Sequence, residues 1–416
     1  MQSHHHASLQ PGSVPRTVNR ALAAAVLASL AVTLIGVAVL WPSRSRIKVP
    51  PGVGGALHLI PGTVSFTRTY ECRYTVTPDG ASADSPAKAT QCETSQVTVQ
   101  SGPERGQDVP VDTNSAAGTA RLRTGEQVLL SRNIGPNNQA SYEFVDYQRG
   151  QPLALLSLLF AVVVVAVARW RGVGALIGLA VTWLVLVRFL LPALLDGRNA
   201  LAVALVASSL ILCLVLFIAH GINARTATAL LGTLASLLLV GAIGATAVGV
   251  TRLTGLASEE GAYLQSVATG VQLRGLLLAG MVIGSLGVLN DMTVTQASAV
   301  WEIHLADPDR TLRDLYRSGM RVGRDHIAST VYTLVLAYAG AALPLILLFD
   351  LGGRKVSDVV TSEIVAEEAV RTLVGSIGLV ACVPLTTLLA ATVVTAARRS
   401  SGETTAPTTA KLPDAG

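Results

Sequence analysis

Long runs of apolar residues alternate with short polar segments along most of this chain of 416 residues. A helix needs about 20 mostly apolar residues to cross the hydrocarbon core of a bilayer, which is the length of these runs. The pattern predicts about eight transmembrane helices, at 21–41, 152–168, 173–195, 199–219, 227–250, 273–289, 328–349 and 372–395. The sequence therefore indicates an all-α polytopic membrane bundle. The first run is longer than the apolar core of a signal peptide, so we expect an uncleaved anchor.

A different pattern fills the hundred or so residues between the first two runs. The segments SQVTVQSG, GQDVPVDT, EQVLLSR and SYEFVDY each alternate apolar with polar residues and are bounded by turn-forming residues. We expect a small antiparallel β barrel or sandwich, inserted after the first span on the extracytoplasmic side. The predicted organisation is a cytoplasmic tail (1–20), an anchor helix (21–41), an extracytoplasmic small β domain (49–150), a multi-spanning domain (151–396) and a disordered cytoplasmic tail (397–416).

Composition and charge support a membrane location. Charged residues make up only 14% of the chain, against about 25% in soluble proteins. Arginines gather in the N-terminal tail, in the 310–324 segment and near the C-terminus, and the positive-inside rule then places both termini in the cytoplasm. The net charge of +5 is weak and no basic run is interleaved with aromatic residues, so we expect no nucleic-acid partner.

The four cysteines fall into two groups. Cys72 and Cys92 lie in the predicted outer β domain, and an oxidising compartment favours a disulfide between them. Cys213 and Cys382 lie in predicted spans, where a cysteine usually acts as a small apolar residue.

The most informative stretch is LGVLNDMTVTQASAVWEIH, residues 286–304. It continues a predicted span, and no Pro or Gly lies between Asn290 and His304 to end a helix. Asp291, Thr295, Ser298 and Glu302 are spaced by four, three and four residues, so they share one helical face next to Asn290. This polar stripe either marks the membrane interface on a surface helix, or lines a hydrated inner cavity that handles an ion or a polar solute.

Other polar and small residues give weaker signals. His220, His304, Asp325 and His326 form a possible polar cluster on the predicted inner side, but they lack the H-x-x-x-H spacing typical of a metal site, so no metal is expected. Glu363, Glu367 and Arg371 have i, i+4 spacing, which favours a salt-bridged surface helix. Gly280, Gly284 and Gly287 predict a close helix–helix contact in lipid.

Four segments carry a resemblance to a known family: HGINARTATALLGT, GLLLAGMVIGSLGVLNDMTVTQASAVWEI, GRDHIASTVYTLVLAYAGAALPLILL and RTLVGSIGLVACVPLTT. Together they resemble the YibE/F-like family of bacterial multi-spanning membrane proteins, over roughly 151–396. The insert is similar to the small β domain of many members, and the preference for Arg over Lys resembles actinobacterial members. The resemblance implies a bacterial plasma-membrane protein without an agreed substrate. It also marks the Asp291 motif as the family's signature, but it supplies no catalytic residue.

Three classes of function were compared on these observations. The first is a transporter or permease for an unknown small solute or ion, with a polar path near Asp291. No Walker A motif occurs in the sequence, so we do not expect ATP to drive such transport directly. The alternative is a membrane scaffold or sensor whose outer β domain binds a ligand or partner. An intramembrane enzyme is disfavoured because only one candidate carboxylate and no G-x-S-x-G motif are found. We expect no enzymatic activity and no cofactor; the expected partners are the lipid bilayer, the solute, and a second copy of the chain or another membrane protein.

Overall fold

The computed structural model describes residues 16–43, 59–74, 88–113, 121–134, 139–268, 270–353 and 355–402. The chain divides into two compact units, one made of Met1–Val49 with Val164–Gly416 and the other of Pro50–Val163. The predicted N-terminal tail and the predicted disordered C-terminal tail lie largely outside the described residues.

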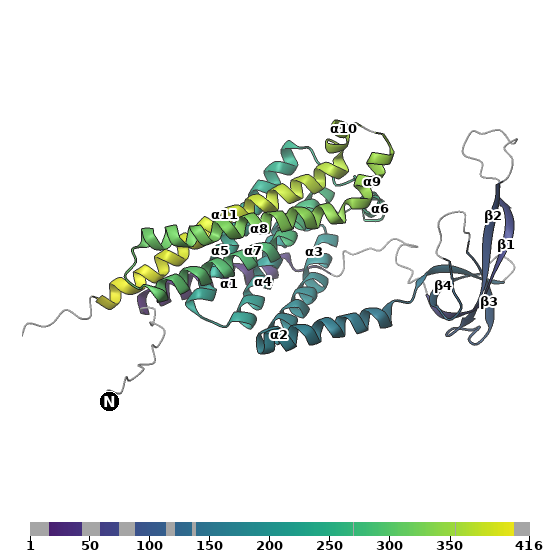
Figure 1. The fold of residues 1–416 in the computed structure, drawn as a ribbon, viewed down its shortest axis with the longest axis horizontal. Coiled ribbons are helices and arrows are strands. Elements are labelled where there is room, and N and C mark those ends of the chain that lie inside the picture. The colour runs from purple at the N-terminus through teal and green to yellow at the C-terminus, as the bar shows by residue number, and fades with distance from the viewer. Residues whose placement is uncertain are drawn as a thin grey trace, which may run out of the picture. The chain divides into compact units, whose positions relative to one another are not determined.

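The helices, labelled in Figure 1, are α1 (Arg16–Leu40), α2 (Gly150–Val185), the π-helical η2 (Leu186–Leu190), α3 (Leu191–Leu195), α4 (Ala200–His220), α5 (Ala224–Val250), α6 (Glu259–Val267), α7 (Leu273–Ala306), α8 (Leu312–Ala341), α9 (Leu343–Leu351), α10 (Val356–Val360) and α11 (Glu363–Gly402).

Six helices in the described part of the chain are long and apolar enough to cross a membrane, or seven if the bent pair α8 and α9 forms one span. This count is lower than the predicted eight because α2, η2 and α3 form one run, Gly150–Leu195, that holds two of the predicted spans. Arg169 interrupts the helix between those two spans, with φ 54° and ψ −133°. The sharp turn also needs Gly172, where an added Cβ would lie 2.5 Å from the carbonyl oxygen of Val164. The number of membrane crossings therefore stays a prediction.

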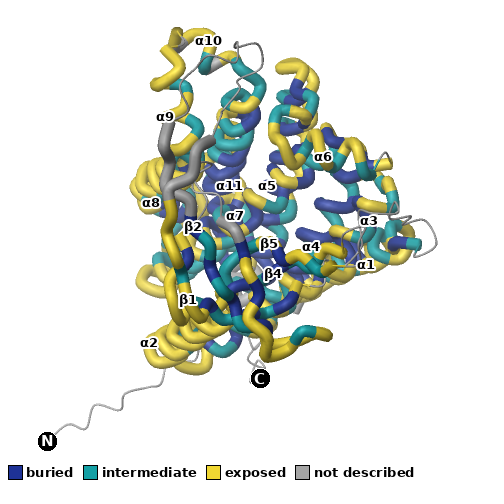
Figure 2. The backbone as a smooth tube through the Cα atoms, turned by 90° about the vertical axis from the view of Figure 1, so that its right-hand side faces the viewer, coloured by how far each residue is buried: buried dark blue, intermediate teal, exposed yellow. Residues whose placement is uncertain are grey.

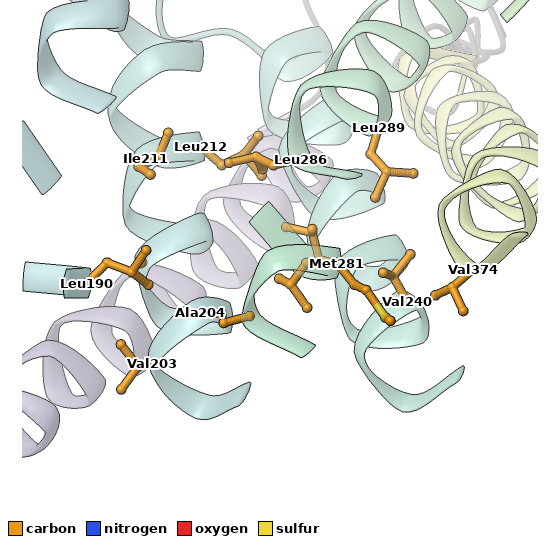
Figure 3. Close-up of a cluster of buried hydrophobic side chains, with 14 of the residues drawn as sticks. Leu190, Val203, Ala204, Ile211, Leu212, Val240, Met281, Leu286, Leu289 and Val374 are labelled. Carbon is orange, nitrogen blue, oxygen red and sulfur yellow. The ribbon is translucent and has the colours of Figure 1, made fainter. Parts of the chain in front are cut away.

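Three helices, α5, α7 and α11, pack against one another at the centre of the helical unit. Helix α4 packs on α7, and α8 packs on both α7 and α11. The buried side chains of these helices, with those of η2 and α3, form one apolar core (Figure 3). Figure 3 shows Leu286 of α7 beside Leu212 of α4, and Met281 of α7 and Val374 of α11 beside Val240 of α5. Burial is thus highest along the shared faces of these helices (Figure 2).

Helices α1 and α2 have a different character, because they expose large apolar side chains. Examples with more than half of their surface exposed are Leu27, Val32, Ile35, Leu155, Leu156, Leu158, Leu159 and Phe160. Such side chains are costly in water and suit contact with lipid.

The smaller unit contains one antiparallel sheet of five strands in the order β3-β2-β1-β4-β5. The strands are β1 (Ile60–Tyr74), β2 (Lys88–Val99), β3 (Asp108–Thr113), β4 (Gln127–Ile134) and β5 (Ala140–Tyr147). The edge strands β3 and β5 also approach each other, so the sheet curls around a core of valine and leucine side chains. The four predicted strands are confirmed as β2 to β5. Strand β1 was not predicted, although Val64, Phe66, Tyr70, Cys72 and Tyr74 alternate with polar residues along it.

The strand register bears on the predicted disulfide. Cys72 of β1 lies opposite Thr90, and Cys92 of β2 lies opposite Tyr70, so the two cysteines are diagonal neighbours. Diagonal Cα atoms are about 7–8 Å apart, which is longer than the roughly 4.4–6.8 Å spanned by a disulfide. This register does not favour a direct disulfide, and the cysteine side chains lie outside the described residues. The other two cysteines, Cys213 and Cys382, are buried and free in the helical core, as predicted.

A polar cluster joins the β4–β5 hairpin to the turn after β2. The Glu104 carboxylate accepts hydrogen bonds from the Arg132 guanidinium at 2.6 and 3.1 Å and from the Tyr142 hydroxyl at 2.7 Å. The hydrogen bonds from Arg132 and then Tyr142 lower the pKa of Glu104 from its ordinary value. The carboxylate therefore stays charged, and it links parts of the sheet that are distant in sequence.

Candidate functional site

The signature stretch forms one continuous helix, as predicted. Helix α7 runs from Leu273 to Ala306 through the apolar and polar parts of the stretch. The run from Asn290 to His304 contains residues that can all continue a helix, and Asp307 ends it as the C-cap. The polar residues after Asn290 therefore lie on the same continuous helix as the apolar span.

The predicted polar stripe lies on the side of α7 that the described residues leave uncovered. Asp291, Thr295 and Glu302 are exposed and Ser298 is half-buried. Glu302 lies 3.7 Å from the guanidinium of Arg225 at the start of α5, in an exposed ion pair. The stripe is thus separate from the packed core of the bundle.

The buried polar side chains of α7 lie on its opposite side, and the stripe did not include them. Gln296 is 2% exposed, and its amide donates hydrogen bonds to the Gly319 carbonyl at 2.8 Å and to the Thr387 hydroxyl at 2.7 Å. Thr293 is fully buried and its hydroxyl lies 2.5 Å from that of Thr233 on α5. These bonds connect α5, α7, α8 and α11, so this polar group serves helix packing.

The glycines of α7 also differ from the prediction. An added Cβ at Gly280 or Gly287 would meet no heavy atom within 4 Å, and at Gly284 it would meet only the Tyr338 hydroxyl. The expected close helix contact is therefore not made at these positions within the described residues. Close contact occurs on α8 instead, where a Cβ at Gly319 would lie 2.8 Å from Thr387 and one at Gly323 would lie 3.0 Å from Gln296.

Gly280 and Gly284 line a cavity of about 670 Å³ at the end of the bundle where α7 and α11 begin. Its apolar walls come from η2, α3, α6 and α7, and its polar lining from α6 and the loop before it, from Tyr338 of α8 and from α11. The charged lining residues are Glu260, Glu367, Glu368 and Arg371. The apolar lining consists mainly of leucines: Leu190, Leu191, Leu194, Leu264, Leu273, Leu276 and Leu277.

The first turns of α11 position the charged groups of this cavity. Glu363 accepts hydrogen bonds from the backbone N–H and hydroxyl of Thr254 and from the N–H of Gly255, which ties α11 to the loop before α6. One turn later, Glu367 is only 8% exposed, and its Oε1 atom is buried without a hydrogen-bond partner. Arg371 forms an ion pair of 2.7 Å with Glu368. The prediction of a salt-bridged surface helix through Glu363, Glu367 and Arg371 was therefore wrong, because Glu367 is buried and lines the cavity.

The exposed side of α7 continues from the cavity along the whole helix. We call it the path face, and it comprises Gly280, Gly284, Gly287, Asp291, Thr295, Ser298 and Glu302. Successive residues of the path face are three or four positions apart, so they share one face of the helix. All are small or polar, unlike the leucines and valines that α1 and α2 expose.

The predicted inner-side polar cluster does not form a metal site. His220 ends α4, His304 lies near the end of α7, and Asp325 and His326 lie together in α8. No group of three or more His, Cys, Asp or Glu side chains suited to a metal ion occurs among the described residues. Asp325 is exposed and His326 is half-buried near the middle of α8.

The long apolar helices around a small-molecule-sized cavity define this chain as an integral membrane protein of the helical-bundle class. A model of the family described as YibE/F-like protein matches residues 156–396, which is more than half of the chain. The chain therefore belongs to the YibE/F-like family. No curated protein and no solved structure matches the chain.

Proposed function

We propose that this protein is a transporter that passes a small polar solute or ion along the path face of α7. The observation that carries the proposal is that the path face begins inside the cavity, at Gly280 and Gly284, and continues as small and polar residues to Glu302. A solute held in the cavity would thus find an unbroken polar track along one helix.

The length of the path face suits this role. Gly280 and Glu302 are 22 residues apart on a continuous helix, which corresponds to about 33 Å at 1.5 Å per residue. The hydrocarbon core of a bilayer is about 30 Å thick. The face therefore extends over about the thickness that a solute has to cross.

The chemistry of the path face also argues against simple exposure to lipid. A charged side chain such as Asp291 is expensive in contact with hydrocarbon and is usually found facing a cavity or a bundle interior. Glycines expose backbone rather than apolar side chains, whereas α2 exposes Leu155, Leu158 and Phe160. A hydrated groove accommodates Asp291 and Thr295 at less cost than lipid does.

The proposed setting is the plasma membrane of a bacterium, with both termini in the cytoplasm. In this orientation, which follows from the arginine distribution, the segment LASEEGAY and the start of α11 lie outside. The cavity then opens to the outside and Glu302 lies at the cytoplasmic end of the path face. No ATP-driven or enzymatic step is part of the proposal.

A pair of matched glycine substitutions tests the path. Gly287 lies on the path face and Gly249 lies on α5; both are exposed, helical, and free of neighbours around an added Cβ. Gly287→Leu should obstruct the path face without a clash, whereas Gly249→Leu should leave transport intact. The readout is the set of cellular solute pools that change when the gene is deleted and that the wild-type protein restores.

Three outcomes matter for this test. Restoration by Gly249→Leu but not by Gly287→Leu, at equal protein level, supports the path. Equal restoration by both variants rejects it. Under the alternative function, a sensor whose outer β domain binds a ligand, both leucine variants would restore the phenotype while a protein lacking residues 59–147 would not.

A further inference from the structure

The charges that line the cavity are unbalanced. Three carboxylates, those of Glu260, Glu367 and Glu368, face one guanidinium, that of Arg371. Arg371 already pairs with Glu368 at 2.7 Å. Glu363, one turn before Glu367 on α11, accepts hydrogen bonds from Thr254 and Gly255 and is not a lining residue of the cavity. The cavity therefore carries an excess of negative charge.

Glu367 is the carboxylate most in need of a partner. Glu260 is exposed and can be solvated by water, but Glu367 is 8% exposed and its Oε1 atom is buried without a hydrogen bond. Burial raises the pKa of Glu367, while the charge of Arg371 and a hydrogen bond from the Gly255 backbone N–H act in the opposite direction. A buried carboxylate oxygen without a partner is destabilising unless the group is neutralised by a proton or by a cation. Because Glu367 lines the cavity, a cation in the cavity can supply the missing partner.

The walls of the cavity restrict the kind of cation. Leucine, from η2, α3, α6 and α7, is the commonest residue of the lining, and Leu194, Leu273 and Leu277 are themselves buried. A hydrated inorganic ion would leave these apolar walls in contact with water, whereas an apolar ligand body would cover them. The volume of about 670 Å³ lies within the range of roughly 300–1,000 Å³ that is typical of small-molecule sites.

We infer that the cavity binds an amphipathic organic amine, whose ammonium group pairs with Glu367 and whose apolar body lies against the leucine wall. This inference rests on the proposed transport function only in naming the amine as the class of substrate. The binding site itself follows from the buried carboxylate, the charge imbalance and the apolar lining.

The experiment measures binding to the purified full-length protein in a non-ionic detergent by isothermal titration calorimetry. The probes are phenethylamine, its neutral counterpart 2-phenylethanol, and the anion 3-phenylpropionate, together with Mg²⁺ and K⁺ as inorganic cations. We expect phenethylamine to bind at least tenfold more tightly than 2-phenylethanol, and 3-phenylpropionate to show no binding. Comparable binding of the amine and the alcohol, or stronger binding of Mg²⁺ or K⁺ than of the amine, would overturn the inference.

Two substitutions assign the charge to one residue. Glu367→Gln keeps the shape of the side chain and should weaken phenethylamine binding at least tenfold. Glu143→Gln, on strand β5 of the smaller unit and exposed, serves as the matched control and should bind like the wild type. Unchanged binding by Glu367→Gln would reject the assignment; the probe series on the wild-type protein keeps the inference testable if this variant does not fold.

Failure of the inference and failure of the proposed function give different results. Suppose that amine binding depends on Glu367 and that the Gly287→Leu variant restores the solute pools fully. The binding site is then supported and the transport path is rejected. Absence of amine binding, with loss of restoration by Gly287→Leu, keeps transport and rejects an amine as the substrate.

Discussion

At the scale of single residues, neighbouring positions on α7 have opposite roles. Thr295 is exposed on the path face, while Gln296 is buried and hydrogen-bonded to Gly319 and Thr387. Successive residues are about 100° apart around a helix, because one turn takes 3.6 residues. Spacing alone identifies which residues share a face but not which face is packed, so the buried polar group around Gln296 was missed. The sequence signal that could have found it is the row of polar residues 293 and 296, three apart, beside the stripe.

The Glu104 cluster allows a prediction about pH at the residue scale. Because hydrogen bonds from Arg132 and Tyr142 lower the pKa of Glu104 in the folded state, the folded state binds this proton less readily than the unfolded state. The stabilisation is present above the ordinary pKa of 4.5 and is lost as the pH falls through the lower folded-state pKa. We expect β4 and β5 to lose protection in hydrogen–deuterium exchange, corrected for intrinsic rates, on going from pH 7 to about pH 3.

Glu104→Gln is the control for this pH effect. The variant lacks the titrating group, so its protection at pH 7 should already be reduced and should fall less on acidification than that of the wild type. Parallel loss of protection in both proteins would show that other carboxylates govern the acid response.

At the scale of elements, the packing of α8 depends on two glycines that the sequence did not single out. Gly319 and Gly323 let α8 approach α7 and α11 closely enough for the Gly319 carbonyl to accept the Gln296 hydrogen bond. A side chain at either position would meet the neighbouring helices. The predicted close contact therefore lies between α8 and the central helices, and Gly280, Gly284 and Gly287 of α7 remain on the path face.

Alanine substitutions on α8 test this close contact. Gly323→Ala places a Cβ against Val383 and 3.0 Å from Gln296, whereas an added Cβ at Gly340, on the same helix, meets nothing within 4 Å. We expect Gly323→Ala to lower stability by about 1–3 kcal/mol, which is typical of overpacking. Gly340→Ala should be neutral or slightly stabilising, because alanine favours the helix over glycine. Thermal unfolding in the same detergent measures both, and equal midpoints for the two variants would contradict the packing.

At the scale of the whole molecule, the side of the membrane to which the cavity opens depends on the orientation of the chain in the membrane. The arginines of residues 310–324 and of the C-terminal segment predict that these parts lie in the cytoplasm. The cavity, formed at the start of α7 and α11, then lies at the outer end of the bundle. Its excess of negative charge would attract cations from the outside.

Reporter fusions test the orientation. A reporter that is active only outside the cytoplasm should be silent when fused after Arg399, and active when inserted in place of GLASEEG, residues 255–261. Fusion at these sites reads topology and does not require an intact cavity. Activity after Arg399 and silence at 255–261 would reverse the orientation and place the cavity on the cytoplasmic side.

The sequence by itself determined the local elements and the family. Apolar run lengths gave the helices, including the unbroken α7; alternation gave strands β2 to β5; and the segments quoted around Asp291 carried the resemblance that the family match over residues 156–396 confirms. Only the tertiary structure decided which sides of these helices are buried. Glu367 has the spacing of a surface residue, yet it is 8% exposed and lines the cavity together with Gly255 and with leucines of α3 and α7. Periodicity along one helix reports relative directions, whereas burial depends on neighbours that are distant in sequence, and this is why the cavity emerged only from the packed bundle.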